Sequence, residues 1–93
     1  MRAIDRASAF KRDYKREAKG RYRSTLDNDL RTVLLALVTD QGLDVRYRDH
    51  DLSGDWAGYR ECHVKPDLLL IYRKADPAIL RLARLGSHSE LFG

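Results

Sequence analysis

Apolar residues between positions 26 and 38 recur at the three- and four-residue steps that form one face of a helix. The members of this stripe are Leu26, Leu30, Val33, Leu34, Leu37 and Val38. The spacing predicts a helix here, and Ser24 with Asp27 resembles a capping box ahead of it. Gly42 supplies the expected stop of this helix.

A shorter amphipathic stretch precedes that helix. Its apolar positions are Ala7, Phe10, Tyr14 and Ala18. Ser8 is suited to cap the start of a helix and Gly20 to end one, so we predict a helix between these two residues. Residues 2–7 are short and are predicted to form a first strand.

The second half of the chain changes to the pattern of strands. Residues 43–58 lack periodicity and are rich in Asp, Gly and Ser, which predicts a long loop that carries function. Three strand-like runs follow, YRECHV, LLLIYRK and ILRLARL, separated by the turn signals KPD and ADPA. We therefore predict one α+β domain over residues 1–93, with two N-terminal helices packed on one face of a twisted antiparallel sheet.

Positive charge is concentrated near the start of the chain. Residues 1–23 hold nine basic and three acidic side chains, out of 18 basic and 14 acidic in total. The outer arc of the first predicted helix carries Lys11, Arg12, Lys15, Arg16 and Lys19. Such an arc is either a solvated helix face or a surface for a polyanion, and RNA or DNA is favoured over a membrane because no large hydrophobic face accompanies it.

Other features narrow the class of protein. No apolar run approaches the roughly 20 residues that span a bilayer, and the first residues form no hydrophobic signal segment, so we expect a cytoplasmic protein without a membrane partner. Cys62 is the only cysteine and has no CxxC companion. We interpret it as a small buried strand residue and not as a nucleophile.

All three histidines, His50, His63 and His88, fall in the second half of the chain. Because strand side chains alternate between faces, Glu61 and His63 are predicted to share one face of a strand. On the last strand, Arg84 is predicted to share a face with Leu80 and Leu82. A meander would bring Arg84 and His88 across the sheet toward Glu61, His63 and Asp67.

Imidazoles, carboxylates and a guanidinium without a serine or thiol nucleophile suit the cleavage of RNA. One group removes the proton of a 2′-hydroxyl, another protonates the leaving 5′-oxygen, and a cation stabilises the charge on phosphorus. Each residue also has a structural interpretation, as a loop histidine, a cross-strand ion pair or a turn former. The histidine spacings of 13 and 25 residues match no recurrent zinc pattern, so we expect neither a metal nor a cofactor.

Several short motifs together resemble a known family. They are RDH, L-x-G-x-W-x-G-Y-R, H-x-x-P-D, L-I-Y and G-x-H-x-x-L-F, in this order between Tyr47 and Phe92. This set resembles the YafQ branch of the RelE/ParE superfamily of bacterial toxin–antitoxin toxins, which are small ribosome-associated mRNA interferases. The resemblance implies a sheet that binds mRNA on the concave face opposite its helices. Family members often carry Trp after the Pro-Asp pair, where this chain has Leu68.

The resemblance also implies roles for individual residues. The implied catalytic residues are His50, His63, Asp67, His88 and Arg84, and the implied substrate contacts are Phe92, Glu61 and Lys65. His88 would be the general acid, and His50 or Asp67 the base. Arg84 would balance the charge of the scissile phosphate, while Phe92 would stack on a base.

The implied partners are mRNA in the ribosomal A site, ribosomal RNA and a cognate antitoxin. The basic helix face would grip ribosomal RNA, and the antitoxin would wrap the toxin and hide its active face. Two alternatives stay open, a ParE-like inhibitor of a topoisomerase and a noncatalytic RNA- or antitoxin-binding module.

Overall fold

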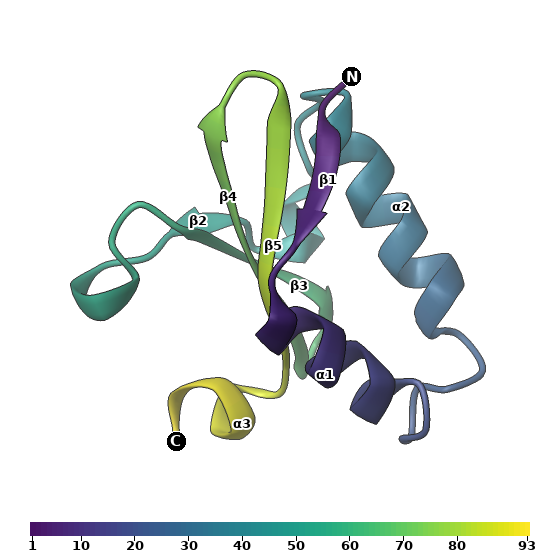
Figure 1. Ribbon diagram of the computed structural model, residues 1–93. Helices are drawn as coiled ribbons and strands as arrows, with labels where there is room; N and C mark the ends of the chain where they lie inside the picture. The colour runs from purple at the N-terminus through teal and green to yellow at the C-terminus, as the bar shows by residue number, and fades with distance from the viewer.

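The computed structural model describes residues 1–93, and it places five strands in a single sheet (Figure 1). The elements in chain order are β1 (Ala3–Arg6), α1 (Ser8–Glu17), α2 (Leu26–Val38), β2 (His50–Asp51), β3 (Arg60–Lys65), β4 (Leu68–Asp76), β5 (Ile79–Gly86) and α3 (His88–Phe92). Two short 3₁₀ turns, η1 (Val45–Tyr47) and η2 (Gly54–Trp56), flank β2. Both predicted helices and all three strands of the second half are confirmed.

The sheet has the spatial order β1-β5-β4-β3-β2 and is mixed. Strands β3, β4 and β5 form the predicted antiparallel meander, and β2 pairs antiparallel with β3. The expectation of a wholly antiparallel sheet is wrong at one edge, because β1 runs parallel to β5. Parallel neighbours need a long crossover, and here the helices and the rest of the sheet provide it.

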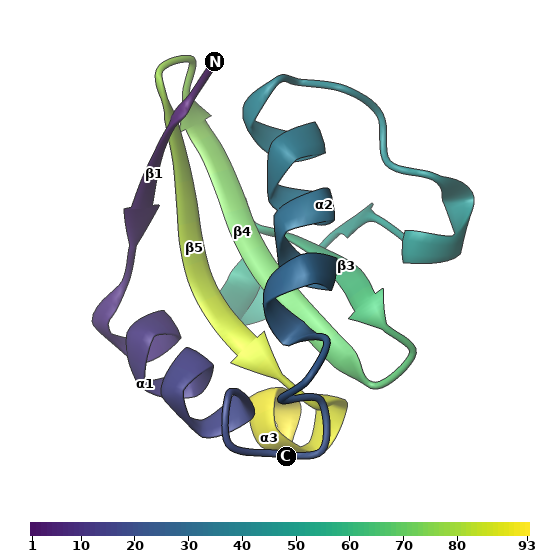
Figure 2. The same cartoon turned by 90° about the vertical axis from the view of Figure 1, so that its right-hand side faces the viewer.

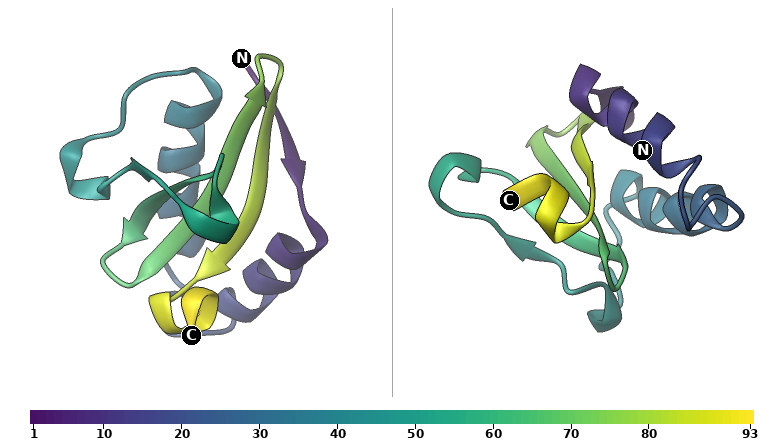
Figure 3. Two further views of the ribbon diagram at one scale, coloured as in Figure 1. Left: turned by 90° about the vertical axis from the view of Figure 1, so that its left-hand side faces the viewer. Right: turned by 90° about the horizontal axis from the view of Figure 1, so that it is seen from below.

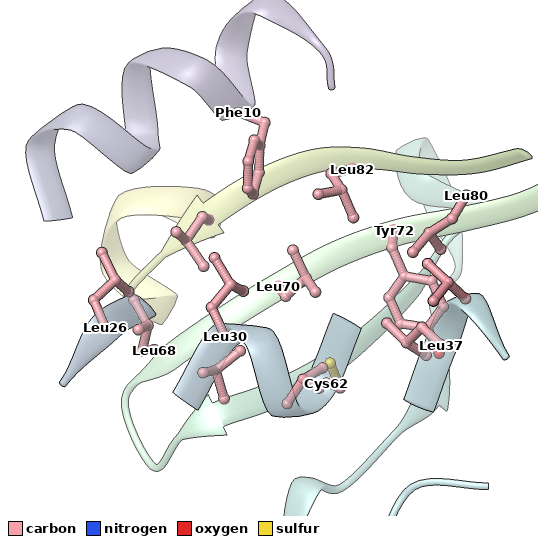
Figure 4. Close-up of a cluster of buried hydrophobic side chains, with 14 residues drawn as sticks. Phe10, Leu26, Leu30, Leu37, Cys62, Leu68, Leu70, Tyr72, Leu80 and Leu82 are labelled. Carbon is pink, nitrogen blue, oxygen red and sulfur yellow. The ribbon is translucent and has the colours of Figure 1, made fainter. Parts of the chain in front are cut away.

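Helix α2 lies across one face of the sheet and buries its apolar stripe there (Figures 2 and 4). Leu30 and Leu37 pack with Leu70 and Tyr72 of β4 in this core. The predicted capping box is wrong, since the N-cap is Thr25 and no side chain caps the helix. The helix ends at Val38, and the left-handed residue beyond it is Asp40 (φ 57°) and not Gly42.

Helix α1 buries Phe10 in the same core and also covers part of the edge of β5. Strand β1 pairs with β5 only as far as Leu82, so the later backbone of β5 lacks a strand partner on that side. Asp13 accepts a hydrogen bond from the Leu85 N–H at 3.0 Å, and Arg16 donates one to the Leu85 carbonyl at 2.9 Å. Two side chains of α1 thus satisfy backbone groups of β5 that have no strand partner.

The ends of α1 differ slightly from the prediction. Ala7 is the N-cap in place of Ser8, and no side chain caps the helix. The helix ends at Glu17, before Gly20.

A bulge in β5 changes which face Arg84 occupies. Leu82 pairs with Tyr72, whereas Arg84 pairs with Ile71, the next residue along β4. Because neighbouring residues of β4 point to opposite faces, Leu82 and Arg84 do so too. The prediction that they share a face is therefore wrong, and Arg84 points away from α2.

The C-terminal residues form a helix and not a frayed tail or a strand. Ser87 and Glu90 make a capping box that starts α3, and Leu91 is buried against Leu69 and Ile71. Figure 3 shows α3 and the chain around β2 on the side of the sheet opposite α2. None of the helices combines the length and the apolar composition that a membrane-spanning segment requires.

Candidate active site

Two rows of paired residues cross the sheet on the face that points away from α2. The first row joins His50, Glu61, Ile71 and Arg84, and the second joins His63, Leu69 and Gly86. Leu69 and Ile71 belong to the apolar cluster under α3, which identifies this face. With strands about 4.8 Å apart, the first row spans about 14 Å and the second about 10 Å. The predicted common face of Glu61 and His63 is confirmed.

A buried carboxylate lies between two of the imidazoles. The Oε1 atom of Glu61 is 3.5 Å from Nε2 of His63 and 3.8 Å from Nε2 of His50. The Glu61 side chain is 7% exposed, while those of His63 and His50 are 20% and 51% exposed. These separations are longer than ordinary hydrogen bonds, so the carboxylate acts mainly through its charge.

The other ring nitrogens of the two imidazoles face backbone carbonyls. Nδ1 of His50 is 2.7 Å from the Arg48 carbonyl oxygen, and Nδ1 of His63 is 3.2 Å from that of Pro66. A carbonyl can only accept, so this arrangement favours a proton on Nδ1 in both rings. Each Nε2 is then free to take up a proton beside Glu61, which compensates the resulting positive charge.

Arg84 reaches this face with part of its guanidinium already bonded. Its Nε and Nη2 atoms donate to Asp13 at 2.7 and 3.2 Å, and its side chain is 27% exposed. Burial alone would raise the pKa of Asp13, but hydrogen bonds from Arg84 and the Leu85 N–H, with the charge of Arg16, hold that pKa below its usual range. The Nη1 group of Arg84 makes no hydrogen bond and is available to a ligand.

His88 comes to the same face on α3. Its ring centroid is 5.1 Å from that of Phe92, one helical turn later, and Phe92 is 38% exposed. The Ser87–Glu90 capping box and a 3.0 Å ion pair between Arg16 and Glu90 hold the helix. No hydrogen bond or ion pair links His88 to the other two histidines, so a substrate would have to bridge them.

Two predicted site residues are bonded elsewhere. Asp67 lies in the turn between β3 and β4 and pairs with Arg21 at 3.0 Å. Lys65 pairs with Asp29 of α2, because a register shift after His63 turns it toward the helix side. The structure therefore brings neither side chain into the group around Glu61.

The basic face of α1 is only partly as predicted. Lys11, Arg12, Lys15 and Lys19 are exposed. Arg16 is bonded instead to Asp13, Glu17 and Glu90 and to the Leu85 carbonyl, so it joins α1 to the start of α3.

Asp13 escaped the sequence analysis. A visible signal was its position on the apolar arc of α1, between Phe10 and Tyr14. Cys62 is fully buried as expected, and burial raises the pKa of its thiol. No group of three or more His, Cys, Asp or Glu side chains is placed to hold a metal ion.

Known proteins are similar to this chain in sequence and in fold. Residues 2–93 match the family model described as bacterial toxin of type II toxin–antitoxin system, YafQ. An Escherichia coli protein named mRNA interferase toxin YafQ is 36% identical over 92 residues, which cover 97% of this chain and 99% of that protein.

Solved structures are similar to this chain over nearly its whole length. A copper-bound mutant toxin from Helicobacter pylori is 38% identical, with a TM-score of 0.86 over 99% of this chain and all of that one. The toxin in a DinJ–YafQ toxin–antitoxin complex from E. coli is also 38% identical, with a TM-score of 0.82 over 99% and 98% of the two chains.

Proposed function

The chain belongs to the YafQ family of toxins of type II toxin–antitoxin systems, and we propose that it is an endoribonuclease that cleaves mRNA in the ribosomal A site. The observation that carries this proposal is the arrangement of His50 and His63 around the buried Glu61, with His88 on α3, which packs on the same face. Internal cleavage of RNA needs one group that takes a proton and another that gives one. Imidazoles perform both tasks near neutral pH.

The proposed reaction uses the 2′-hydroxyl of the RNA as its nucleophile. His50 removes the hydroxyl proton through Nε2, and the 2′-oxygen then bonds to phosphorus. The bond from phosphorus to the 5′-oxygen breaks, and His88 gives this oxygen a proton. The products are a 2′,3′-cyclic phosphate and a 5′-hydroxyl end.

The base is assigned to His50 in preference to Asp67. Asp67 is paired with Arg21, whereas the His50 side chain is half exposed and its Nε2 atom accepts no hydrogen bond. Beside His50, His63 supplies a second imidazole and Glu61 supplies a compensating negative charge. Arg84 donates through Nη1 to the phosphate oxygens, where positive charge stabilises the transition state.

Substrate binding is assigned to exposed groups around this centre. Phe92 is a stacking surface for one base, a contact that contributes about 1–3 kcal/mol. Four cations without an ion pair contact ribosomal RNA through its phosphates, Lys11, Arg12 and Lys15 on α1 and Lys19 just after it. Arg16 is left out of this surface because its charge is already paired.

We also propose that a cognate antitoxin binds on the helix side of the sheet. A groove of about 920 Å³ lies there between β1, α1 and α2, and the exposed Ile4 and Leu35 line it. Its basic lining residues are Arg6, Lys11, Lys15 and Arg31, against the single acid Asp27. This combination supports an acidic amphipathic segment of the antitoxin as its occupant.

The test is cleavage of mRNA on programmed bacterial ribosomes, with the 5′ ends mapped. We expect cutting by the wild type and a fall of about 10²–10⁴-fold in its rate for His50→Gln and His88→Gln. An mRNA with a 2′-deoxy group at the cut nucleotide should resist the wild type. Full activity of His88→Gln would remove His88 from catalysis, and inhibition of gyrase supercoiling without RNA cutting would favour the ParE-like alternative.

A further inference from the structure

A second cleft begins at His63 and lies along the open edge of β3. It measures about 560 Å³, within the roughly 300–1,000 Å³ range of ligand sites. Strand β2 pairs only with Arg60 and Glu61, so the rest of this edge of β3 has no strand partner. The walls are α2, at Asn28 and Thr32, and the turn that contains η1. We call it the β3-edge cleft.

The charged lining of the β3-edge cleft suits a phosphate. Three of the lining residues, Arg46, Arg48 and Lys65, are cationic, and Asp29 is the only carboxylate among them. Lys65 is paired with Asp29 and so compensates that negative charge. The exposed Arg48 side chain makes no hydrogen bond or ion pair, which leaves its planar guanidinium free to bind two phosphate oxygens.

The same wall carries a flat surface for a base. The Arg46 guanidinium lies over the Tyr47 ring, 4.8 Å from its centroid, and donates to the Tyr47 hydroxyl at 2.8 Å. Tyr47 in turn packs against the main core, which anchors the pair. Unpaired RNA bases stack on aromatic rings and on arginine planes held in this way.

The turn that forms this wall is also connected to the catalytic group. Arg48 has a left-handed backbone (φ 50°), which costs a residue with a side chain about 1 kcal/mol or more. Its carbonyl accepts the hydrogen bond from Nδ1 of His50 at 2.7 Å. The carbonyl of Arg48 thus contacts the proposed catalytic imidazole of His50, while the side chain of Arg48 is exposed to solvent at the cleft.

We propose that the β3-edge cleft binds the RNA nucleotide next to the scissile phosphate. Arg48 contacts the phosphate of this nucleotide, and the Arg46–Tyr47 pair stacks on its base. His63 lines both the cleft and the catalytic group, so a single strand passes from one to the other without a gap. This inference rests on the proposed nuclease function and adds a subsite to it.

The test measures RNA binding separately from cleavage. In the His88→Gln background, binding to mRNA-programmed ribosomes is titrated at several salt concentrations with and without Arg48→Ala. We expect Arg48→Ala to weaken binding about tenfold, because one charge-assisted contact is lost. The slope of log affinity against log salt concentration should become smaller in magnitude by about 0.7. Arg48→Lys should restore part of the affinity. Arg23→Ala removes the same charge from an exposed residue that lies outside the cleft, and it should not change binding.

Single-turnover cleavage then identifies what Arg48 does. We expect Arg48→Ala, in the otherwise wild-type chain, to raise the half-saturating concentration and to keep the maximal rate. Unchanged affinity with a lower maximal rate would overturn the subsite and leave Arg48 as a positioning residue for His50. If the wild type never cuts mRNA but Arg48→Ala still weakens binding, the nuclease function is refuted and the subsite is kept.

A cross-link locates the bound strand directly. An mRNA with 4-thiouridine beside the cleavage site should cross-link to the segment 46–48, which peptide mass spectrometry identifies. Cross-links of the 4-thiouridine only to ribosomal RNA or to other segments of the toxin would overturn the proposal.

Discussion

Asp13 is the residue on which the position of Arg84 depends. Its carboxylate is 4% exposed and accepts from the Arg84 guanidinium, the Leu85 N–H and Arg16. A buried carboxylate is tolerated only while such donors surround it. One side chain of α1 therefore closes the edge of β5 and also orients the arginine that we assign to the scissile phosphate.

Replacing this carboxylate tests its contribution to stability. Asp13→Asn keeps the shape but removes the charge that three donors share, so we expect a loss of about 1.5–3 kcal/mol in the free energy of unfolding at pH 7. The folded pKa of Asp13 is lowered, and its contribution is complete above the unfolded value near 3.9. It is lost as the pH falls from about 4 through the folded pKa.

Urea denaturation between pH 7 and pH 2 measures both effects. Asp13→Asn should lose less of its unfolding free energy below pH 4 than the wild type does. Asp55→Asn is the matched control, because Asp55 is exposed and makes no ion pair. Equal acid sensitivity of Asp13→Asn and the wild type would contradict the assigned role.

At the scale of elements, α3 determines where His88 and Phe92 lie. The helix has five residues, too few to be stable alone. It depends on the Ser87–Glu90 capping box, on buried Leu91 and on the ion pair with Arg16. Local opening of α3 would remove the proposed acid and the stacking surface together.

Two serine variants separate a real helix cap from an apparent one. Ser87→Ala should cost about 1 kcal/mol of helix stability and lower the cleavage rate, because His88 then spends more time away from the sheet. Ser24→Ala is the control, since Ser24 resembles a cap in the sequence but makes no capping bond in the structure. Amide exchange of α3 and single-turnover cleavage are the measurements. Equal effects of the two variants would contradict the role of the cap.

The sequence predicted best the elements in which a short hydrophobic pattern repeats over many residues. The stripe of α2 and the strand-like runs of β3 to β5 are local patterns, and the common face of Glu61 and His63 followed from the position of both residues on β3. Strand β2 has only two residues and leaves no local pattern. Strand β1 was predicted, but its parallel pairing was not, because its partner lies more than 70 residues away. The bulge before Arg84 and the buried Asp13 likewise depend on contacts that arise only on folding.

At the scale of the whole molecule, the sheet separates two surfaces. Figure 3 shows α1 and α2 on one side, and α3 with the chain around β2 on the other. The histidines lie on the second side, whereas the groove assigned to the antitoxin lies on the first. Substitutions of the histidines and of the apolar groove residues should therefore affect different activities, while Lys11 and Lys15 belong to both the groove and the proposed ribosomal RNA surface.

Leu35→Asp tests this separation. Leu35 is 57% exposed on α2, so the variant should fold, yet it places a carboxylate in a groove that suits an acidic partner. We expect affinity for the cognate antitoxin to fall at least about tenfold, which corresponds to about 1.4 kcal/mol, and ribosomal mRNA cleavage to stay unchanged. His88→Gln should show the converse pattern.

Calorimetry with purified antitoxin and single-turnover cleavage measure the two effects. Val45→Asp is the control for antitoxin binding, because Val45 is 89% exposed and lies outside the groove. Wild-type antitoxin affinity for Leu35→Asp would show that the antitoxin binds elsewhere. Loss of cleavage by the same variant would mean that the apolar part of the groove, and not only the cations of α1, contacts the ribosome. An antitoxin seated in the groove would then block the toxin without touching its histidines.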